Sequence, residues 1–230
     1  MALRDATVHI FIESSNVGWN SLDCTHRVSP CRCNVDVLFK VTPERLVMSV
    51  WLASGSDRRF SILSKLVDDL HASALEEVDE TPPAGDVRTQ VLSICRRKAK
   101  AVPVNNAYDF VVVADTLVGD PDDANAAMGK PEDSAQALAM LKRLSGRRHQ
   151  VWSATGVCIL GDWTFFVESS VVEISELTNE ELGSLIDSKS WKGKAGGYDL
   201  AGQMETYASL IDGDELTVLG FAPAALQLLN

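Results

Sequence analysis

The stretch that decides the fold is Phe-Val-Val-Val-Ala-Asp-Thr, residues 110–116. Its first five residues are all apolar, without the polar alternation of a half-exposed strand. A strand whose two faces are both covered by other elements has this composition. We therefore expect residues 110–114 to form a buried central strand, with Asp115 and Thr116 at its end.

A second buried strand is expected at residues 50–53, Val-Trp-Leu-Ala. Ser-Gly-Ser follows at 54–56, and apolar residues then recur at helical spacing as far as Leu70. A strand, a tight turn and a helix in this order direct backbone N–H groups toward an anion. This turn is therefore a candidate phosphate-binding loop.

The rest of the chain mixes strand and helix patterns. We expect strands at 75–78, 151–160, 164–174 and 216–219, helices at 86–101, 131–144, 178–188 and 224–229, and loops at 117–130 and 193–202. Gly161-Asp162 indicates a hairpin, and Thr178 followed by two glutamates indicates a capped helix start. This mixture predicts an α/β or α+β fold on one central sheet.

The composition restricts the class of protein. The chain has 230 residues, of which 46% are hydrophobic and 23% charged, so it can bury a sizeable core. A net charge of −11 argues against binding nucleic acid, which draws on a positive field. No apolar run approaches the ~20 residues of a membrane helix. Five cysteines, an odd number, favour a reducing compartment. We expect a cytoplasmic protein with no membrane partner.

The charge balance changes near Met48. Residues 1–47 hold five basic and five acidic side chains, so the whole net charge falls on residues 48–230. A strand pattern begins directly after Met48. We therefore predict an N-terminal extension at 1–47, outside the fold, followed by one folded domain at 48–230.

A metal-binding module is the alternative for the extension. Its candidate ligands are Cys24, His26, Cys31 and Cys33. Cysteine and histidine are the ligand types that zinc prefers. Their spacing, C-x-H-x4-C-x-C, matches no established finger pattern, so an extension without a chemical role is the favoured interpretation.

Four short clusters lie at the ends of predicted elements, where binding sites are often built. They occupy residues 52–59, 114–116, 129–131 and 194–198. Small residues in the first allow a ligand close to the backbone, and arginine binds phosphate oxygens in pairs. The carboxylate of Asp115 can hold a metal or accept a proton. Taken singly, each cluster also fits an ordinary role, such as a helix start, a turn aspartate or a solvated lysine.

The clusters are more informative together than apart. The basic residues among them, with one from the middle helix, are Arg58, Arg59, Lys98, Lys130 and Lys194. If they converge in this acidic chain, they form a positive pocket that matches a triphosphate. Glu80 and Asp115 could then hold a divalent cation, which favours carboxylate and phosphate oxygens. The chain has no Gly-x-x-x-x-Gly-Lys-Ser/Thr loop, which argues against a P-loop enzyme.

Seven motifs carry a family resemblance: LASGSDRR (52–59), VDE (78–80), KA (98–99), ADT (114–116), GKP (129–131), LSGRRHQV (144–151) and KAGGY (194–198). In this order they resemble the Maf-like nucleoside triphosphate pyrophosphatases, from Met48 to the C-terminus. That family converts a nucleoside triphosphate to the monophosphate and pyrophosphate, as a house-cleaning activity on nonstandard or surplus nucleotides. The resemblance implies an elongated α/β fold with a mixed central sheet, flanking helices and a central cleft, like the inosine-triphosphate pyrophosphatases. It also implies a divalent cation, Mg²⁺ or Mn²⁺, and a homodimer.

The resemblance assigns roles to matching residues. The resemblance implies that Asp115 is the proton acceptor and that Asp115 and Glu80 are metal ligands. It also implies that Lys130 is a second catalytic residue. The implied substrate contacts are Ser54, Arg58, Arg59, Lys98, Thr116 and Lys194. Among these, Arg58 and Thr116 match positions linked to the choice of base.

Departures from the family pattern leave the substrate open. The usual proline of the first motif is Asp57, and the last Gly-Leu-Pro is Gly-Phe-Ala at 220–222. The family's Tyr-Gly-Ile-Gln-Gly is Tyr-Asp-Leu-Ala-Gly at 198–202, so the glutamine tied to pyrimidine recognition is Ala201. The substrate is either dTTP/UTP-like or a modified nucleotide such as 7-methyl-GTP. The alternative function is a catalytically weak nucleotide-binding regulator, of cell division for example.

Overall fold

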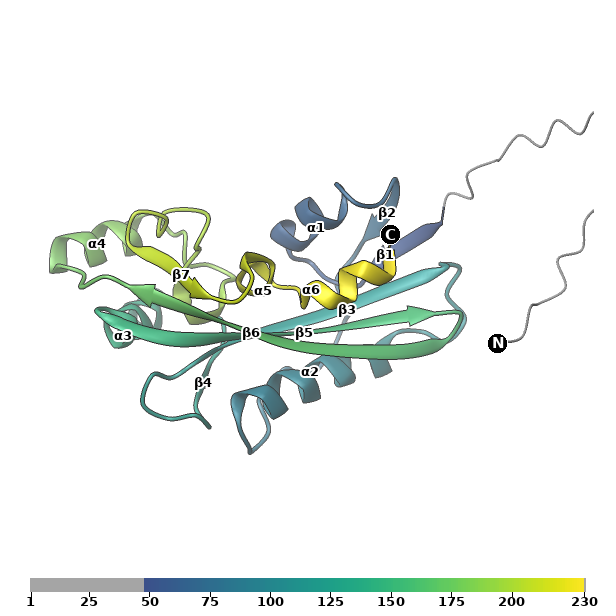
Figure 1. The fold of residues 1–230 in the computed structure, drawn as a ribbon, viewed down its shortest axis with the longest axis horizontal. Coiled ribbons are helices and arrows are strands. Elements are labelled where there is room, and N and C mark those ends of the chain that lie inside the picture. The colour runs from purple at the N-terminus through teal and green to yellow at the C-terminus, as the bar shows by residue number, and fades with distance from the viewer. Residues whose placement is uncertain (1–47, 230) are drawn as a thin grey trace, which may run out of the picture. The chain divides into compact units, whose positions relative to one another are not determined.

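The computed structural model describes residues 48–229, and these residues form one mixed seven-stranded sheet flanked by helices (Figure 1). The strands are β1 (Ser49–Leu52), β2 (Asp69–Ala72), β3 (Phe110–Gly119), β4 (Ala127–Met128), β5 (Arg147–Ile159), β6 (Asp162–Ile174) and β7 (Ala208–Asp212). The helices are α1 (Asp57–Leu63), α2 (Val87–Ala101), α3 (Ser134–Leu144), α4 (Asn179–Asp187), α5 (Glu215–Leu219) and α6 (Pro223–Leu226), with 3₁₀ turns η1 (Ala195–Gly197) and η2 (Gln227–Leu229). The Cys24–Cys33 zinc-type spacing and the rest of the predicted extension lie outside the described residues. No helix between residues 48 and 229 is long and apolar enough to cross a bilayer.

The sheet has the strand order β2-β1-β3-β5-β6-β7, with β4 paired to β3. The expected burial of β3 on both faces is confirmed. Val111 and Val113 pack in the cluster that contains α2, whereas Val112 and Ala114 pack in the cluster that contains α1 and α6. Figure 1 shows α2 on one side of the sheet and α1 with α6 on the other. The central position of β3 therefore follows from its apolar sequence.

One edge of β3 is interrupted. β1 pairs in parallel with residues 110–112 of β3, and β4 pairs antiparallel with residues 118–119. Between them, residues 113–117 have no strand partner on this edge within the described chain. The carboxyl end of β1 opens onto this gap, and ligands of open α/β sheets bind at such carboxyl ends. The interruption in strand pairing thus provides a place for a site in the middle of the sheet.

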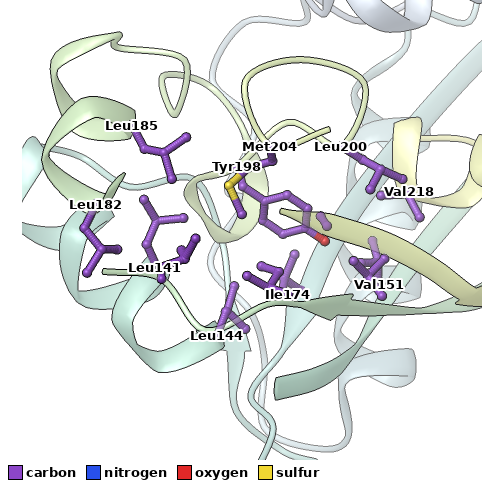
Figure 2. Close-up of a cluster of buried hydrophobic side chains, with 14 residues drawn as sticks. Leu141, Leu144, Val151, Ile174, Leu182, Leu185, Tyr198, Leu200, Met204 and Val218 are labelled. Carbon is purple, nitrogen blue, oxygen red and sulfur yellow. The ribbon is translucent and has the colours of Figure 1, made fainter. Parts of the chain in front are cut away.

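A third core cluster packs α3 and α4 against the other end of the β5–β6 hairpin. Leu141 of α3 and Leu182 of α4 meet Ile174 of β6 in this cluster. Figure 2 shows Tyr198, which follows η1, among these side chains. The loop at residues 193–202 is therefore anchored on the core by an aromatic side chain.

Several sequence expectations are confirmed closely. The helix predicted at 86–101 is α2, with Asp86 as its N-cap. The predicted hairpin is β5–β6, which turns at Leu160 and Gly161, both at positive φ. Thr178 caps α4 in a capping box with Glu181. In each case a short-range signal, a cap or a turn residue, determines the local structure.

The expectations for the edge strands were wrong. The second strand is β2, at 69–72, and not the expected 75–78. Residues 69–72 alternate between exposed and half-buried side chains, and they pair in parallel with β1. The strand expected at 216–219 is α5, capped by Asp214, and the sheet ends instead with the largely exposed β7. Edge strands with exposed faces lack the apolar run that marks a central strand.

The loop expected at 117–130 was also too long. β3 continues to Gly119, because Leu117 and Val118 are buried and β5 pairs along residues 110–118. Two later residues then form β4. Similarly, α3 begins at Ser134, after its cap Asp133, and not at Pro131. Sheet pairing here overrides the glycine and aspartate residues that indicated a loop.

Candidate active site

An alternating chain of charges begins at Asp115 in β3. Lys98, in the last turn of α2, donates from Nζ to Asp115 Oδ1 at 2.7 Å. The same Nζ pairs with Glu80 Oε1 at 3.0 Å, and Lys130 Nζ lies 3.4 Å from Glu80 Oε2. Four of the predicted site residues, from four separate segments, are therefore in contact.

Asp115 has an unusual environment for a carboxylate. Its side chain is buried, and its Oδ2 atom has no hydrogen-bond partner within residues 48–229. An oxygen of this kind costs free energy unless something else satisfies it. Lys98 holds the other oxygen and so fixes the direction of the carboxylate. The free oxygen is suited to bind a cation or to accept a proton from water.

Glu80 is more exposed than Asp115 but is bound by two cations. Partial burial raises the pKa of its carboxyl, and the charges of Lys98 and Lys130 outweigh that effect, so the pKa lies below its ordinary value. Glu80 therefore stays ionised near neutral pH. The carboxylates of Glu80 and Asp115 thus lie on either side of the Lys98 Nζ atom.

The carboxylates fit a divalent cation that arrives with a phosphate ligand. In the described part of the chain, no three His, Cys, Asp or Glu side chains gather as a metal site of their own. Mg²⁺ is commonly held by one or two carboxylates together with substrate phosphates and water. The carboxylates of Asp115 and Glu80, which both contact Lys98, are the protein groups that would hold such a cation.

A buried arginine holds together the other side of the gap. Arg59 of α1 donates from Nε to the Gly220 carbonyl at 2.9 Å and from NH2 to Thr116 Oγ1 at 3.0 Å. Its NH1 lies 3.4 Å from Ser54 Oγ. Burial lowers the pKa of the guanidinium, and the negative charge of Asp115 opposes that shift. Arg59 is therefore a fixed positive charge that positions Ser54 and Thr116.

Gly220 is required for that contact. It has φ of 121°, and a Cβ atom there would lie 2.9 Å from Arg59 Nε. A side chain at this position would displace the guanidinium from the carbonyl that holds it. The sequence pattern at 220–222 did not predict this role, because the contact spans 161 residues.

The remaining predicted cations meet at a third carboxylate. Arg58 NH1 lies 3.3 Å from Asp199 Oδ1, and Lys194 Nζ lies 3.1 Å from Asp199 Oδ2. Lys194 also donates to the Ser190 carbonyl at 2.7 Å. Asp199 was recognised in the sequence only as part of a divergent motif. The structure places it between two residues expected to contact substrate.

The two sides of the site are joined through β3 and through the loops. Asp115 and Thr116 are consecutive in the strand, so their side chains project to opposite faces. Asp115 contacts α2, and Thr116 contacts Arg59 of α1 and Ser153 of β5. Both residues lie in the part of β3 that has no strand partner on one edge. The predicted residues therefore form separate groups on the two faces of β3, and Asp115 and Thr116 connect the groups within the strand.

A pocket lies on the Thr116 side of the gap. It is lined by Arg58, Thr116, Val118, Val151, Ala195, Tyr198, Leu200 and Val218. The loop that carries Lys194 is attached to the loop that carries Lys130, because the Gly196 N–H donates to the Gly129 carbonyl at 3.0 Å. The pocket thus combines one cation, Arg58, and two hydroxyl-bearing residues, Thr116 and Tyr198, with aliphatic side chains.

His149 is a further residue of interest that the sequence did not single out. Its Nε2 lies 2.8 Å from the Tyr198 hydroxyl, and its buried Nδ1 has no partner among the described residues. Burial lowers the pKa of His149 to about 4, and burial also raises the pKa of Tyr198 well above its ordinary value. The pair is therefore neutral and fixes a wall of the pocket. In the sequence, His149 is noted only as one residue of the LSGRRHQV motif.

Comparison with known proteins gives consistent matches. Residues 49–229 match the family model described as Maf-like protein. The chain is 37% identical over 174 residues to a protein named dTTP/UTP pyrophosphatase from Roseobacter denitrificans, covering 74% of this chain and 88% of that one. A Ruegeria protein of the same name is 36% identical over 189 residues, covering 79% and 93%. A solved structure, the Staphylococcus aureus Ham1 protein, matches with a TM-score of 0.39 and 14% identity, over 55% of this chain and 71% of that one.

Proposed function

The chain belongs to the Maf-like protein family, and from this membership we propose that it is a nucleoside triphosphate pyrophosphatase. It would hydrolyse a nucleoside triphosphate to the monophosphate and pyrophosphate. The observation that supports this most directly is the buried Asp115 carboxylate, held by Lys98 on one oxygen and unpaired on the other, beside a set of cations.

Asp115 would act as the proton acceptor for the attacking water. Its unpaired Oδ2 atom can take the proton, and the bond from Lys98 to Oδ1 keeps the carboxylate in one orientation. A positioned general base of this kind contributes roughly 10²–10⁴-fold to a rate. The oxygen of the water would form a bond to the α-phosphorus while the bond to the pyrophosphate oxygen breaks.

Glu80 and Asp115 would hold a divalent cation, Mg²⁺ or Mn²⁺. When bound, the cation supplies positive charge to the phosphate oxygens and helps to orient them. Lys98 keeps the two carboxylates close together, because it pairs with both. Lys130 is exposed and lies beside Glu80, where it can reach the departing pyrophosphate.

The remaining cations would bind the phosphate chain. Arg58 and Lys194 pair with the partly exposed carboxylate of Asp199, whereas Arg59 is buried and donates to the Gly220 carbonyl. We assign Arg59 a positioning role for Ser54 and Thr116, with its charge adding to the field around the phosphates. Fixed charges of this kind stabilise a leaving group without reorganising during the reaction.

A pyrimidine nucleotide is the first substrate to test, because the relatives above carry the name dTTP/UTP pyrophosphatase. The pocket beside Thr116, which is too small to hold a base without movement of its walls, contains Arg58 and Thr116, the two residues whose positions the family pattern links to the choice of base. Ala201 lacks the amide that the family pattern ties to pyrimidine recognition, so a modified nucleotide belongs in the same test.

A catalytically weak nucleotide-binding regulator is the second candidate. One observation favours it: Asp199 already pairs with Arg58 and Lys194, two of the cations assigned to the phosphates. Tight binding of nucleotide without turnover would select this candidate over the enzyme.

The test is release of pyrophosphate from a panel of dTTP, UTP, CTP, GTP, ATP and 7-methyl-GTP, with Mg²⁺ or Mn²⁺. We expect turnover of at least one member. Asp115→Asn should lower kcat by roughly 10²–10⁴-fold with an unchanged circular dichroism spectrum. Absence of pyrophosphate from every triphosphate, or near-normal turnover by the variant, would contradict the proposal.

A further inference from the structure

The carboxylate of Asp199 occupies a position between two cations that come from opposite ends of the domain sequence. Arg58 lies 141 residues earlier in the chain, and its NH1 is 3.3 Å from Oδ1. Lys194 Nζ is 3.1 Å from Oδ2. Each carboxylate oxygen thus faces its own cation, as two oxygens of a phosphate group would.

The backbone is shaped to accommodate this carboxylate. A Cβ atom on Gly202 would lie 3.1 Å from Asp199 Oδ2, so the glycine leaves room for the side chain where it stands. The Gly202 N–H also donates to the Asp199 carbonyl at 3.1 Å, which closes the turn around it. Asp199 is therefore held beside the two cations by the geometry of its own loop.

We propose that Asp199 is an internal competitor of the substrate, which must leave Arg58 and Lys194 before a phosphate chain can bind them. This inference rests on the proposed function, because it concerns the cations of that same site. The competitor weakens the binding of both the triphosphate and the pyrophosphate product. Its benefit is faster release of pyrophosphate, which would otherwise remain on the same cations.

The exposure of the three side chains makes such an exchange feasible. The side chains of Arg58, Lys194 and Asp199 are 28%, 21% and 17% exposed. Ion pairs that water reaches contribute little to stability, so they can be broken at small cost. Asp57, which stands where the family pattern has a proline, is exposed, and the carboxylate that pairs with Arg58 is Asp199.

The experiment compares the full-length wild type with Asp199→Asn, which keeps the size of the side chain and removes its charge. Inorganic pyrophosphate is the binding probe, measured by calorimetry at two salt concentrations. Asp162→Asn is the matched control, because Asp162 is an exposed carboxylate at the β5–β6 turn, away from the cations. It reports the effect of changing the net charge alone.

We expect Asp199→Asn to bind pyrophosphate about 3- to 10-fold more tightly than the wild type, with the gain shrinking at high salt. The KM for the triphosphate should fall by a similar factor, and kcat should not rise. Asp162→Asn should match the wild type. Equal or weaker binding by Asp199→Asn, no binding by either protein, or an equal gain in the control would overturn the inference.

The two claims fail in different ways. If the wild type hydrolyses no triphosphate but Asp199→Asn still binds pyrophosphate more tightly, competition at the cations holds and the proposed enzymatic function is wrong. If the wild type releases pyrophosphate and the variant binds it no better, the enzymatic function holds and the competition is wrong.

Discussion

At the scale of single residues, Lys98 is the side chain on which the acid pair depends. It is buried at the end of α2, and its ammonium group contacts both Asp115 and Glu80. A buried charge pair is weak support for stability in itself, but removing one partner leaves an uncompensated charge inside the protein. The positive charge of Lys98 therefore offsets the electrostatic repulsion between the two carboxylates.

We predict that Lys98→Met lowers the free energy of unfolding by about 3–5 kcal/mol, because Asp115 is left buried without its cation. Urea unfolding at neutral pH measures this change. Lys100→Met is the matched control, since Lys100 lies in the same helical turn but is exposed. A loss below 1 kcal/mol for Lys98→Met, or an equal loss in the control, would show that the pair is not buried as described.

His149 gives a prediction about pH. Burial lowers its pKa from 6.5 to about 4, so the folded protein keeps the ring neutral while the unfolded chain takes up a proton below pH 6.5. Stability should therefore fall by about 1.4 kcal/mol per pH unit as the pH drops from 6.5 toward 4, roughly 3 kcal/mol in all. In His149→Gln this decrease should be absent, so the difference in unfolding free energy between wild type and variant should change by this amount across that range. Parallel curves for the two proteins would refute the assignment.

At the scale of elements, the contrast between central and edge strands explains how much of the fold could be predicted. β3 was predicted because both of its faces are apolar, and α2 because its apolar residues recur on one face of a helix. β2 and β7 were missed because their exposed residues depend on pairing with β1 and β6, which no local pattern specifies. Pairing between distant segments is a property of the folded chain.

The candidate site divides in the same way. The residue types around Asp115 were predicted from short motifs, since carboxylates and lysines at the ends of elements indicate their own chemistry. The contacts of Arg59 with Gly220 and of Arg58 with Asp199 were not predicted, because they join segments more than 140 residues apart. Contacts over such sequence separations form only in the folded chain.

The η1 loop supports a test with a built-in control. Gly193 and Gly196 have nearly equal φ values, 70° and 69°, but a Cβ on Gly196 would lie 2.9 Å from Val118, whereas no atom lies within 4 Å of one on Gly193. Gly193→Ala should cost about 1 kcal/mol of unfolding free energy, from backbone strain alone. Gly196→Ala should cost about 1–3 kcal/mol more, because it overpacks against β3. Equal losses, measured by urea unfolding, would show that η1 does not pack on Val118.

At the scale of the whole molecule, the fold brings together groups that have no relation in sequence. Glu80 lies in the loop before α2, Asp115 in the central strand and Lys130 after β4. Lys98 joins Asp115 to Glu80, and Glu80 in turn contacts Lys130. Asp115 lies where β3 has no strand partner on one edge within the described residues. The boundary at residue 48, the role of residues 1–47 and the homodimer stay predictions.

The metal requirement tests whether the assembled carboxylates act together. Removal of divalent cations with EDTA should stop turnover, and Mg²⁺ should restore it. Glu80→Gln should raise the half-saturating Mg²⁺ concentration on the order of tenfold, because one of two anionic ligands is lost. Glu76→Gln, an exposed glutamate in the same loop, is the control. An unchanged Mg²⁺ dependence in Glu80→Gln would remove that residue from the metal site.

The most direct test of the central claim is hydrolysis of the preferred triphosphate in ¹⁸O-labelled water, followed by ³¹P NMR. If the water activated by Asp115 attacks the α-phosphorus, the products are the monophosphate, which carries the label, and unlabelled pyrophosphate. Label in the pyrophosphate, or formation of a diphosphate and inorganic phosphate, would contradict the arrangement of acid pair and cations proposed for this protein.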